Sequence, residues 1–163
     1  MCNSRYSTEN DYLCRMEIKE LTSLTEAQVA DLLNLMAVLD DTVAVTPEML
    51  RAAAEAPETH LFAAVEGGHI VGCASLCITR HPLGLKGGVE DVVVSPACRG
   101  MGLGRKLMEH IIGYARGLAP IELHLTSRPS RVAANQLYVS LGFQPHQTNV
   151  YKMPVLSSGP GLA

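Results

Sequence analysis

The sequence predicts one mixed α/β domain in which about four helices flank a central sheet. Three observations predict this class. Apolar β-rich runs alternate with runs of helical period, two glycines join two of the β-rich runs, and a later strand leads through a helix into another strand. The strand–helix–strand order is typical of parallel pairing, whereas the glycine turn predicts antiparallel pairing. The chain has 163 residues, enough for one core but not for two ordinary domains.

Composition and charge argue against several classes of protein. Hydrophobic residues make up 47% and charged residues 18% of the chain, as in a globular protein, and the net charge of −3 offers no basic field to nucleic acid. The sequence shows no signal peptide and no apolar run that could cross a bilayer, so we expect a cytoplasmic protein without a membrane partner. The five cysteines and six histidines lack disulfide or metal-ligand spacing, so no metal is expected.

The ends of the chain differ in composition from its centre. Residues 1–14 are polar and aperiodic and are expected to form a flexible tail. Residues 157–163 are rich in Ser, Gly and Pro and are expected to be disordered. The predicted domain therefore spans residues 15–156.

The domain is predicted to begin with a strand and two helices. Residues 16–20 alternate as a short strand does, and residues 22–39 carry apolar side chains at helical spacing. Ser23 or Thr25 is the expected cap of this helix. Thr46-Pro47 favours the start of a second helix, because proline suits the first helical position, and this helix is expected to end near Pro57.

Three strands follow in the prediction. Residues 61–65 and 69–78 form a hairpin at Gly67-Gly68, since both central positions of the favoured turn need positive φ. Residues 81–88 are rich in Gly and Pro and are expected to form a loop. Residues 89–94 are the strongest strand of the chain.

The rest of the domain is predicted to alternate helices with strands. An amphipathic helix over residues 102–116 precedes a strand at 121–125. A last helix is expected to be capped by Ser130 and ended by Gly142 in a left-handed conformation. Residues 150–155 are expected to form a final strand.

The most specific feature is the glycine-rich turn after the strand at 89–94. It reads Arg99-Gly100-Met101-Gly102-Leu103-Gly104-Arg105 and opens a helix. Glycines let the backbone approach a ligand closely, and the first amides of a helix have no partner inside the helix. These amides, the positive end of the helix dipole and the flanking cations predict a site for an anion such as a pyrophosphate.

Three kinds of phosphate-binding turn were weighed for this feature. The phosphate loop of nucleotide hydrolases needs a glycine–lysine pair followed by a hydroxyl residue, and the sequence has none. The glycine motif of a dinucleotide fold needs a third glycine, and Arg105 stands at that position. That motif also follows its strand directly, whereas here five residues separate Val94 from Gly100. An acyl-CoA turn, Arg/Gln-x-x-Gly-x-Gly/Ala between a strand and a helix, matches residues 99–104 at every fixed position.

A second motif points to a family. Residues 134–143 read Ala-Asn-Gln-Leu-Tyr-Val-Ser-Leu-Gly-Phe and resemble the Asn-x-x-Leu-Tyr-x-x-x-Gly-Phe signature of the GCN5-related N-acetyltransferase (GNAT) family. With the hairpin and the N-terminal helices in the family's order, the resemblance covers about residues 16–155. Two motifs at the expected separation are more specific than either alone. The resemblance implies the single-domain GNAT fold, in which two central strands splay apart.

The resemblance implies residues that bind acetyl-CoA. The main chain of Val92, Val93 and Val94 would pair with the pantetheine arm, while their side chains stay in the core. The turn would hold the pyrophosphate through Arg99, Gly100, Met101, Gly102, Leu103, Gly104 and Arg105. Asn135 would reach the cofactor from the last helix, although an exposed asparagine without a ligand explains it equally well.

The resemblance also implies two catalytic residues. Tyr138 would protonate the departing thiolate, the alternative being a core tyrosine with its hydroxyl at the surface. Glu90 is preferred as the base that takes a proton from the amine, although a substrate-binding or salt-bridge role is equally credible. Asp91 follows it on the strand, so its side chain is expected on the opposite face, in a structural role.

Other residues near the expected cleft have ordinary explanations as well. His124 fits either the cleft or a plain strand position, and Cys98 is expected to be incidental. Two explanations fit the group Ser127, Arg128 and Arg131. These residues either help to bind the cofactor or the acceptor, or they form a solvated, capped helix start.

The predicted function is transfer of an acetyl group from acetyl-CoA directly to a primary amine in a ternary complex. Main-chain amides of the valine strand would polarise the thioester carbonyl. The alternative is a non-catalytic acyl-CoA-binding or sensing domain on the same scaffold. The sequence does not specify the amine, which belongs to a small molecule or a peptide, and the expected assembly is a monomer or a homodimer.

Overall fold

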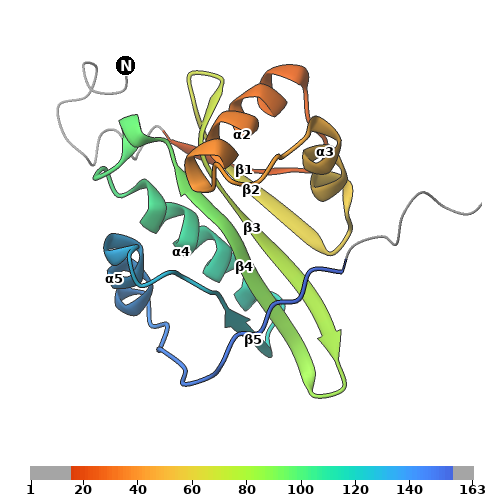
Figure 1. The fold of residues 1–163 in the computed structure, drawn as a ribbon, viewed down its shortest axis with the longest axis vertical. Helices are drawn as coiled ribbons and strands as arrows, with labels where there is room; N and C mark the ends of the chain where they lie inside the picture. The colour runs from red at the N-terminus through yellow and green to blue at the C-terminus, as the bar shows by residue number, and fades with distance from the viewer. Residues whose placement is uncertain (1–15, 156–163) are drawn as a thin grey trace, which may run out of the picture.

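The fold is a mixed sheet with helices on both faces. The computed structural model describes residues 16–155, so the tails expected at 1–14 and 157–163 lie outside the described residues. The sheet has five strands in the order β1-β2-β3-β4-β5, with α2 and α3 on one face and α4 on the other (Figure 1). Strands β1 to β4 pair antiparallel and β4 pairs with β5 in parallel, as the mixed α/β class predicts. No helix within residues 16–155 has the length and apolar character to cross a membrane.

The first strand and the first two helices form where their local signals predict them. They are β1 (Glu17–Leu21), α2 (Glu26–Leu39) and α3 (Pro47–Glu55). The cap of α2 is Thr25 rather than Ser23, because Thr25 forms a capping box with Gln28. In this box the Gln28 amide donates to Thr25 Oγ1 at 3.3 Å, and the Thr25 amide donates to Gln28 Oε1 at 2.9 Å. Thr46 caps α3 in a similar way.

The central strands are longer than predicted. They are β2 (Thr59–Glu66), β3 (His69–His81) and β4 (Gly84–Val94), and the loop predicted at 81–88 is wrong. Glycine content predicted a loop, but Gly87 serves close packing: a Cβ atom there would lie 2.6 Å from Leu123 Cδ2. The ladder between β3 and β4 continues to the pair His81–Gly84, so pairing overrides local propensity.

The C-terminal third contains a 3₁₀ turn (Pro96–Cys98), α4 (Leu103–Arg116), β5 (Ile121–His124) and α5 (Val132–Ser140). The cap of α5 is Arg131 and not Ser130, and no side chain bonds to the first turn. Gly142 has a φ of 98°, which confirms the left-handed end of this helix.

The strand predicted at residues 150–155 does not form. The segment runs extended past the sheet without pairing to any described strand (Figure 1), and Tyr151 and Met153 are 87% and 81% exposed. The segment has strand-forming residues, but a strand also needs a partner, and local composition does not supply one.

The core lies in layers on the two faces of the sheet. Leu32 and Leu35 of α2 pack over β2 and β3 on one face. On the other face Met108 and Ile111 of α4 pack against Phe62 and Leu76. Burial of each such side chain contributes about 1.5–3 kcal/mol. Strand β4 takes part in both layers, through Val93 on the α2 face and Val89 on the α4 face.

Candidate active site

Strands β4 and β5 pair over a short length and then separate. Their register runs from Leu85–Ile121 to Gly88–His124, after which β4 continues to Val94 without a β5 partner. We call this region, residues 89–94 of β4 together with residues 125–131 after β5, the splay. It confirms the splayed strands that the resemblance implied. Main-chain groups on this side of β4 have no neighbouring strand to bond with, so an extended ligand fits them.

A β-bulge lies inside the splay. Asp91 has a φ of 53°, and the register with β3 shifts between Cys73 and Ser75. Burial raises the pKa of the Cys77 thiol, and both Glu90 and Asp91 raise it further through their charges. Val89 and Val92 both pack in the apolar cluster with α4, whereas Val93 packs in the cluster with α2, so Glu90 and Asp91 together take the place of one residue on the face opposite α4. The expectation that Glu90 and Asp91 point to opposite faces is wrong, because the bulge interrupts the alternation of the strand.

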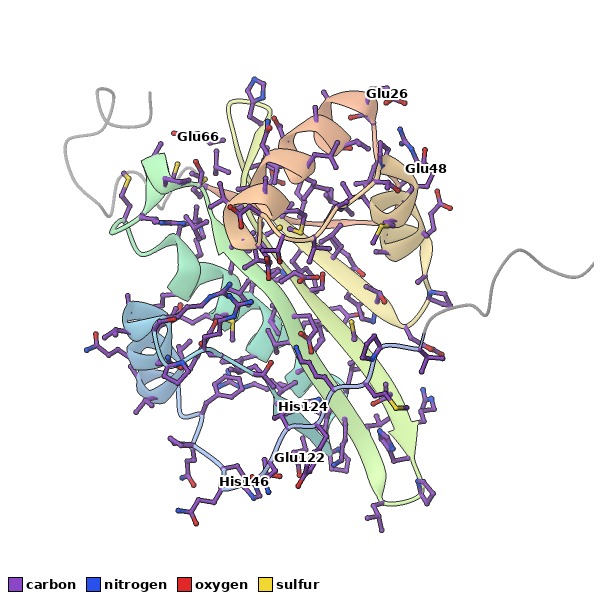
Figure 2. All side chains as sticks on the ribbon, in the orientation of Figure 1. Glu26, Glu48, Glu66, Glu122, His124 and His146 are labelled. Atoms are coloured by element: carbon purple, nitrogen blue, oxygen red, sulfur yellow. The ribbon has the colours of Figure 1, made fainter. Side chains whose placement is uncertain are left out.

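Glu90 and His124 lie together where the splay begins. Gly88 and His124 form the last pair of the β4–β5 register. Glu90 Oε1 and His124 Nε2 each lie 3.5 Å from the position that a Cβ atom would take on Gly88. His124 and Glu122 extend from β5 to the same side (Figure 2). The sequence motifs do not single out His124, because its position beside Glu90 depends on the alternation of β5 and on the register of β5 with Gly88.

The glycine-rich turn has the conformation that an anion site needs. Gly100 and Gly102 have φ values of 76° and 73°, and Gly102 is the cap of α4 without a side chain to occupy its first amides. A Cβ atom on Gly100 would meet nothing within 4 Å, so the space in front of the turn is open. Leu103, the first residue of α4, is buried and anchors the start of the helix.

The two arginines of the turn form hydrogen bonds with neighbouring elements, Arg99 with β4 and Arg105 with α5. Arg99 Nε donates to the Val94 carbonyl at 3.3 Å. Arg105 Nη2 donates to Ser140 Oγ at 2.6 Å, and Arg105 also pairs with Glu109 at 3.6 Å. The Val94 carbonyl, expected to bond to the pantetheine arm, is thus bonded to Arg99 in this structure. Both cations nevertheless lie at the turn, where they add positive charge to the start of α4.

Tyr138 lies on α5 and is half-buried. It shares a cluster of apolar contacts with Val92, and its ring meets Phe143 edge to face with centroids 6.2 Å apart. Burial raises the pKa of the Tyr138 hydroxyl, and the charge of Arg131 lowers it in part. The hydroxyl therefore keeps its proton at neutral pH, which a general acid requires.

Asn135 has a partner within the protein. Its Nδ2 donates to the Arg128 carbonyl at 3.0 Å, so it holds the loop before α5. This bond gives Asn135 a structural role in addition to the cofactor contact that the resemblance implied. Close by, Ser127 Oγ is buried and forms no hydrogen bond with the residues described.

Within residues 16–155 the structure also places Cys98 and the side chains that could ligate a metal. Cys98 is buried beside Leu103 and Leu107, away from the open side of the turn. The described residues contain no group of three or more His, Cys, Asp or Glu side chains arranged to hold a metal ion.

Solved structures share this fold. A putative acetyltransferase from Agrobacterium tumefaciens str. C58 superposes with a TM-score of 0.73 and 25% identity, over 85% of this chain and 99% of that one. An acetyltransferase from Trypanosoma brucei superposes with a TM-score of 0.67 and 26% identity, again over 85% and 99%.

Sequence comparison identifies the family. The Acetyltransferase (GNAT) family profile matches residues 27–143. The N-alpha-acetyltransferase RimI of Mycobacterium tuberculosis (strain ATCC 25618 / H37Rv) is 34% identical over 88 residues, 54% of either chain. The glucosamine 6-phosphate N-acetyltransferase of Trypanosoma brucei brucei is 35% identical over 94 residues, 55% of this chain and 60% of that protein. The matches thus span between 54% and 60% of these relatives. The chain belongs to the GNAT family of acetyltransferases, as its two motifs indicated.

Proposed function

We propose that this chain transfers an acetyl group from acetyl-CoA directly to a primary amine in a ternary complex. One observation carries the proposal: β4 ends, unpaired on its β5 side, at a glycine turn whose left-handed Gly102 leaves the first amides of α4 open. The turn suits a pyrophosphate and the strand suits an extended amide-bearing arm. Acetyl-CoA combines both groups.

The donor would be held mainly by main-chain groups. Amides of Leu103, Gly104 and Arg105 at the start of α4 receive the pyrophosphate, with the charges of Arg99 and Arg105 beside them. The strand residues 92–94 bind the pantetheine arm and polarise the thioester carbonyl. Asn135 contributes by holding the Arg128 carbonyl, and thereby the loop that forms the other side of the splay.

Two side chains handle protons in the proposed reaction. Glu90 takes a proton from the ammonium group, directly or through water, and the free amine then forms the C–N bond as the C–S bond breaks. Tyr138 donates its proton to the departing sulfur, and the proton left on the new amide nitrogen passes to the Tyr138 phenolate, directly or through water. Asp91 lies on the same face as Glu90, so two carboxylates stand where the ammonium group arrives. Much of the rate enhancement comes from bringing thioester and amine together.

The wider setting follows from the same proposal. The acceptor is the amine of a small molecule or a peptide, and we infer a cytoplasmic enzyme that acts as a monomer or homodimer. By their names, the relatives described above are an N-alpha-acetyltransferase and a glucosamine 6-phosphate N-acetyltransferase, and both names suit a primary amine acceptor.

Incubation with acetyl-CoA and a panel of amines tests the proposal. The panel includes peptides, lysine, polyamines and amino sugars, and mass spectrometry follows both free CoA and acetylated amine, with a reaction lacking amine as the control. We expect amine-dependent release of CoA. Tight CoA binding without turnover across the panel would favour the sensing domain, and preference for NAD over CoA would overturn the assignment.

A further inference from the structure

Two contacts join the end of α2 to the loop between β5 and α5. Arg128 Nη2 donates to Asp40 Oδ2 at 3.0 Å, and Arg131 Nη2 donates to the Leu39 carbonyl at 3.0 Å. These partners lie 88 and 92 residues apart in the chain, so only the fold brings them together. We call Leu39, Asp40, Arg128 and Arg131 the latch.

The latch bridges the two sides of the splay. Leu39 packs against the apolar cluster that includes Val93 of β4. Arg128 and Arg131 belong to the chain that has already separated from β4 after the Gly88–His124 pair. A contact between these two groups therefore crosses the gap in which an extended ligand would lie along residues 92–94.

Further hydrogen bonds and the helix dipole orient the groups on both sides of the latch. The Thr42 amide donates to Asp40 Oδ1 at 3.1 Å and leaves Oδ2 to Arg128. Helix α2 has no basic residue in its last turn, so Arg131 supplies from another element the positive charge that a helix C-terminus favours. On the opposite side, Asn135 holds the main chain of Arg128.

The Arg128–Asp40 ion pair of the latch is expected to have a small but measurable effect on ligand release. The Arg128 side chain is 70% exposed and that of Asp40 28%, which makes their pair a solvent-screened one. Such pairs change an equilibrium by about two- to fivefold. A contact of this strength slows the escape of a bound ligand without blocking its entry.

We propose that Asp40, Arg128 and Arg131 are positioning residues that close the splay over the bound donor and slow its release. The inference rests on the proposed function, because it takes CoA as the occupant of the splay. The latch residues contact no reacting atom, and the quantity they are expected to change is the dissociation rate of CoA and not the turnover number.

The test measures the dissociation rate of a fluorescently labelled CoA chased by excess unlabelled CoA. Arg128→Gln and Asp40→Asn should each speed dissociation by about two- to fivefold with a melting temperature close to that of the wild type. Arg80→Gln removes an equal charge from the exposed end of β3 and should leave the rate unchanged. Exchange of the pair, Asp40→Arg with Arg128→Asp, should restore the slow rate. Added salt should speed dissociation more from the wild type than from Arg128→Gln, in which only the charges around the pyrophosphate remain to be screened.

The outcomes separate the two proposals. If CoA binds and the Arg128→Gln rate equals the wild-type rate, the latch is overturned while the proposed function stands. The latch is also overturned if the melting temperatures of both single variants fall in proportion to their faster dissociation and the exchanged pair does not restore the slow dissociation rate. If the wild type does not bind CoA at all, the proposed function fails and the latch fails with it.

Discussion

At the scale of single residues, the candidate site depends on groups whose surroundings change their chemistry. The bulge on β4 holds Asp91 in a left-handed conformation and directs its carboxylate to the face that carries Glu90. Burial raises the pKa of Asp91 and also that of Tyr138. Both shifts favour the protonated form, and each leads to a prediction that a conservative substitution can test.

Asp91→Asn should stabilise the protein at neutral pH. Because the folded-state pKa of Asp91 is raised, its ionisation opposes folding above that pKa and has no effect below the unfolded value of about 3.9. Asparagine tolerates the left-handed conformation, so the backbone is preserved. Thermal unfolding should show a higher melting temperature for the variant at pH 7 and no difference near pH 3. An equal gain at both pH values would contradict the electrostatic explanation.

Tyr138→Phe should lower turnover far more than donor affinity. Loss of a positioned acid lowers kcat by about 100-fold or more, whereas the CoA dissociation constant should change less than about twofold. Because burial raises the hydroxyl pKa, loss of the acid through ionisation should lower wild-type kcat only above about pH 10. Steady-state kinetics against pH and calorimetric titration with CoA measure both quantities. Unchanged turnover would remove Tyr138 as the acid.

At the scale of elements, the start of α4 determines what the site can bind. Its cap is a glycine with positive φ, no side chain caps its first amides, and the 3₁₀ turn before it buries Cys98 as an anchor. A helix start with an ordinary serine or aspartate cap would occupy those amides itself. The glycine thus gives up the stability of a cap and keeps the donors for a ligand.

Gly102→Glu should abolish CoA binding and leave the fold in place. A side chain at a φ of 73° costs about 1–2 kcal/mol, and the new carboxylate stands where an anion is expected. Gly102→Ala is the matched control, since it carries the same backbone strain without the charge. Urea unfolding should show similar losses for both variants, while calorimetric titration should show that Gly102→Ala keeps more of the affinity. Equal affinity losses would contradict the role of charge.

At the scale of the whole molecule, two apolar layers cover the two faces of the sheet. Among the described residues, β4 has no strand beside residues 89–94 on its β5 side. Cys73 lies at the centre of this arrangement, fully buried between β2 and β4. Burial, together with the charge of Asp91, raises the pKa of its thiol to about 12. The thiol is therefore both inaccessible and protonated in the folded state.

Labelling of Cys73 by a thiol reagent should report global unfolding. We expect its rate at neutral pH to rise with urea in parallel with the unfolded fraction, because only the opened chain exposes it. Cys77 is half-buried and should react in the folded protein, which makes it the internal control. Peptide mapping after timed alkylation distinguishes the two sites. Fast labelling of Cys73 without urea would show that the sheet opens locally.

Much of the fold and of the turn followed from local rules. Thr25 and Thr46 cap helices because their hydroxyls reach amides three residues on, and Gly142 ends a helix because it tolerates positive φ. The glycine turn and the Tyr138 motif are contiguous in the chain, so the sequence alone indicated the family that the comparisons confirm.

What depends on partners far away in the chain was decided by the tertiary structure. The extension of β3 and β4 through 81–88, the bulge at Asp91 and the placement of His124 beside Glu90 all depend on strand register. The unpaired segment 150–155 and the Arg128–Asp40 contact likewise depend on what lies beside them in space. The sequence by itself determined the class of fold, the starts of α2 and α3 and the anion-binding turn, because these depend on neighbouring residues, whereas the cap predicted at Ser130 was wrong. The tertiary structure decided which side chains meet in the splay, because pairing energies between distant segments are not encoded in local propensity.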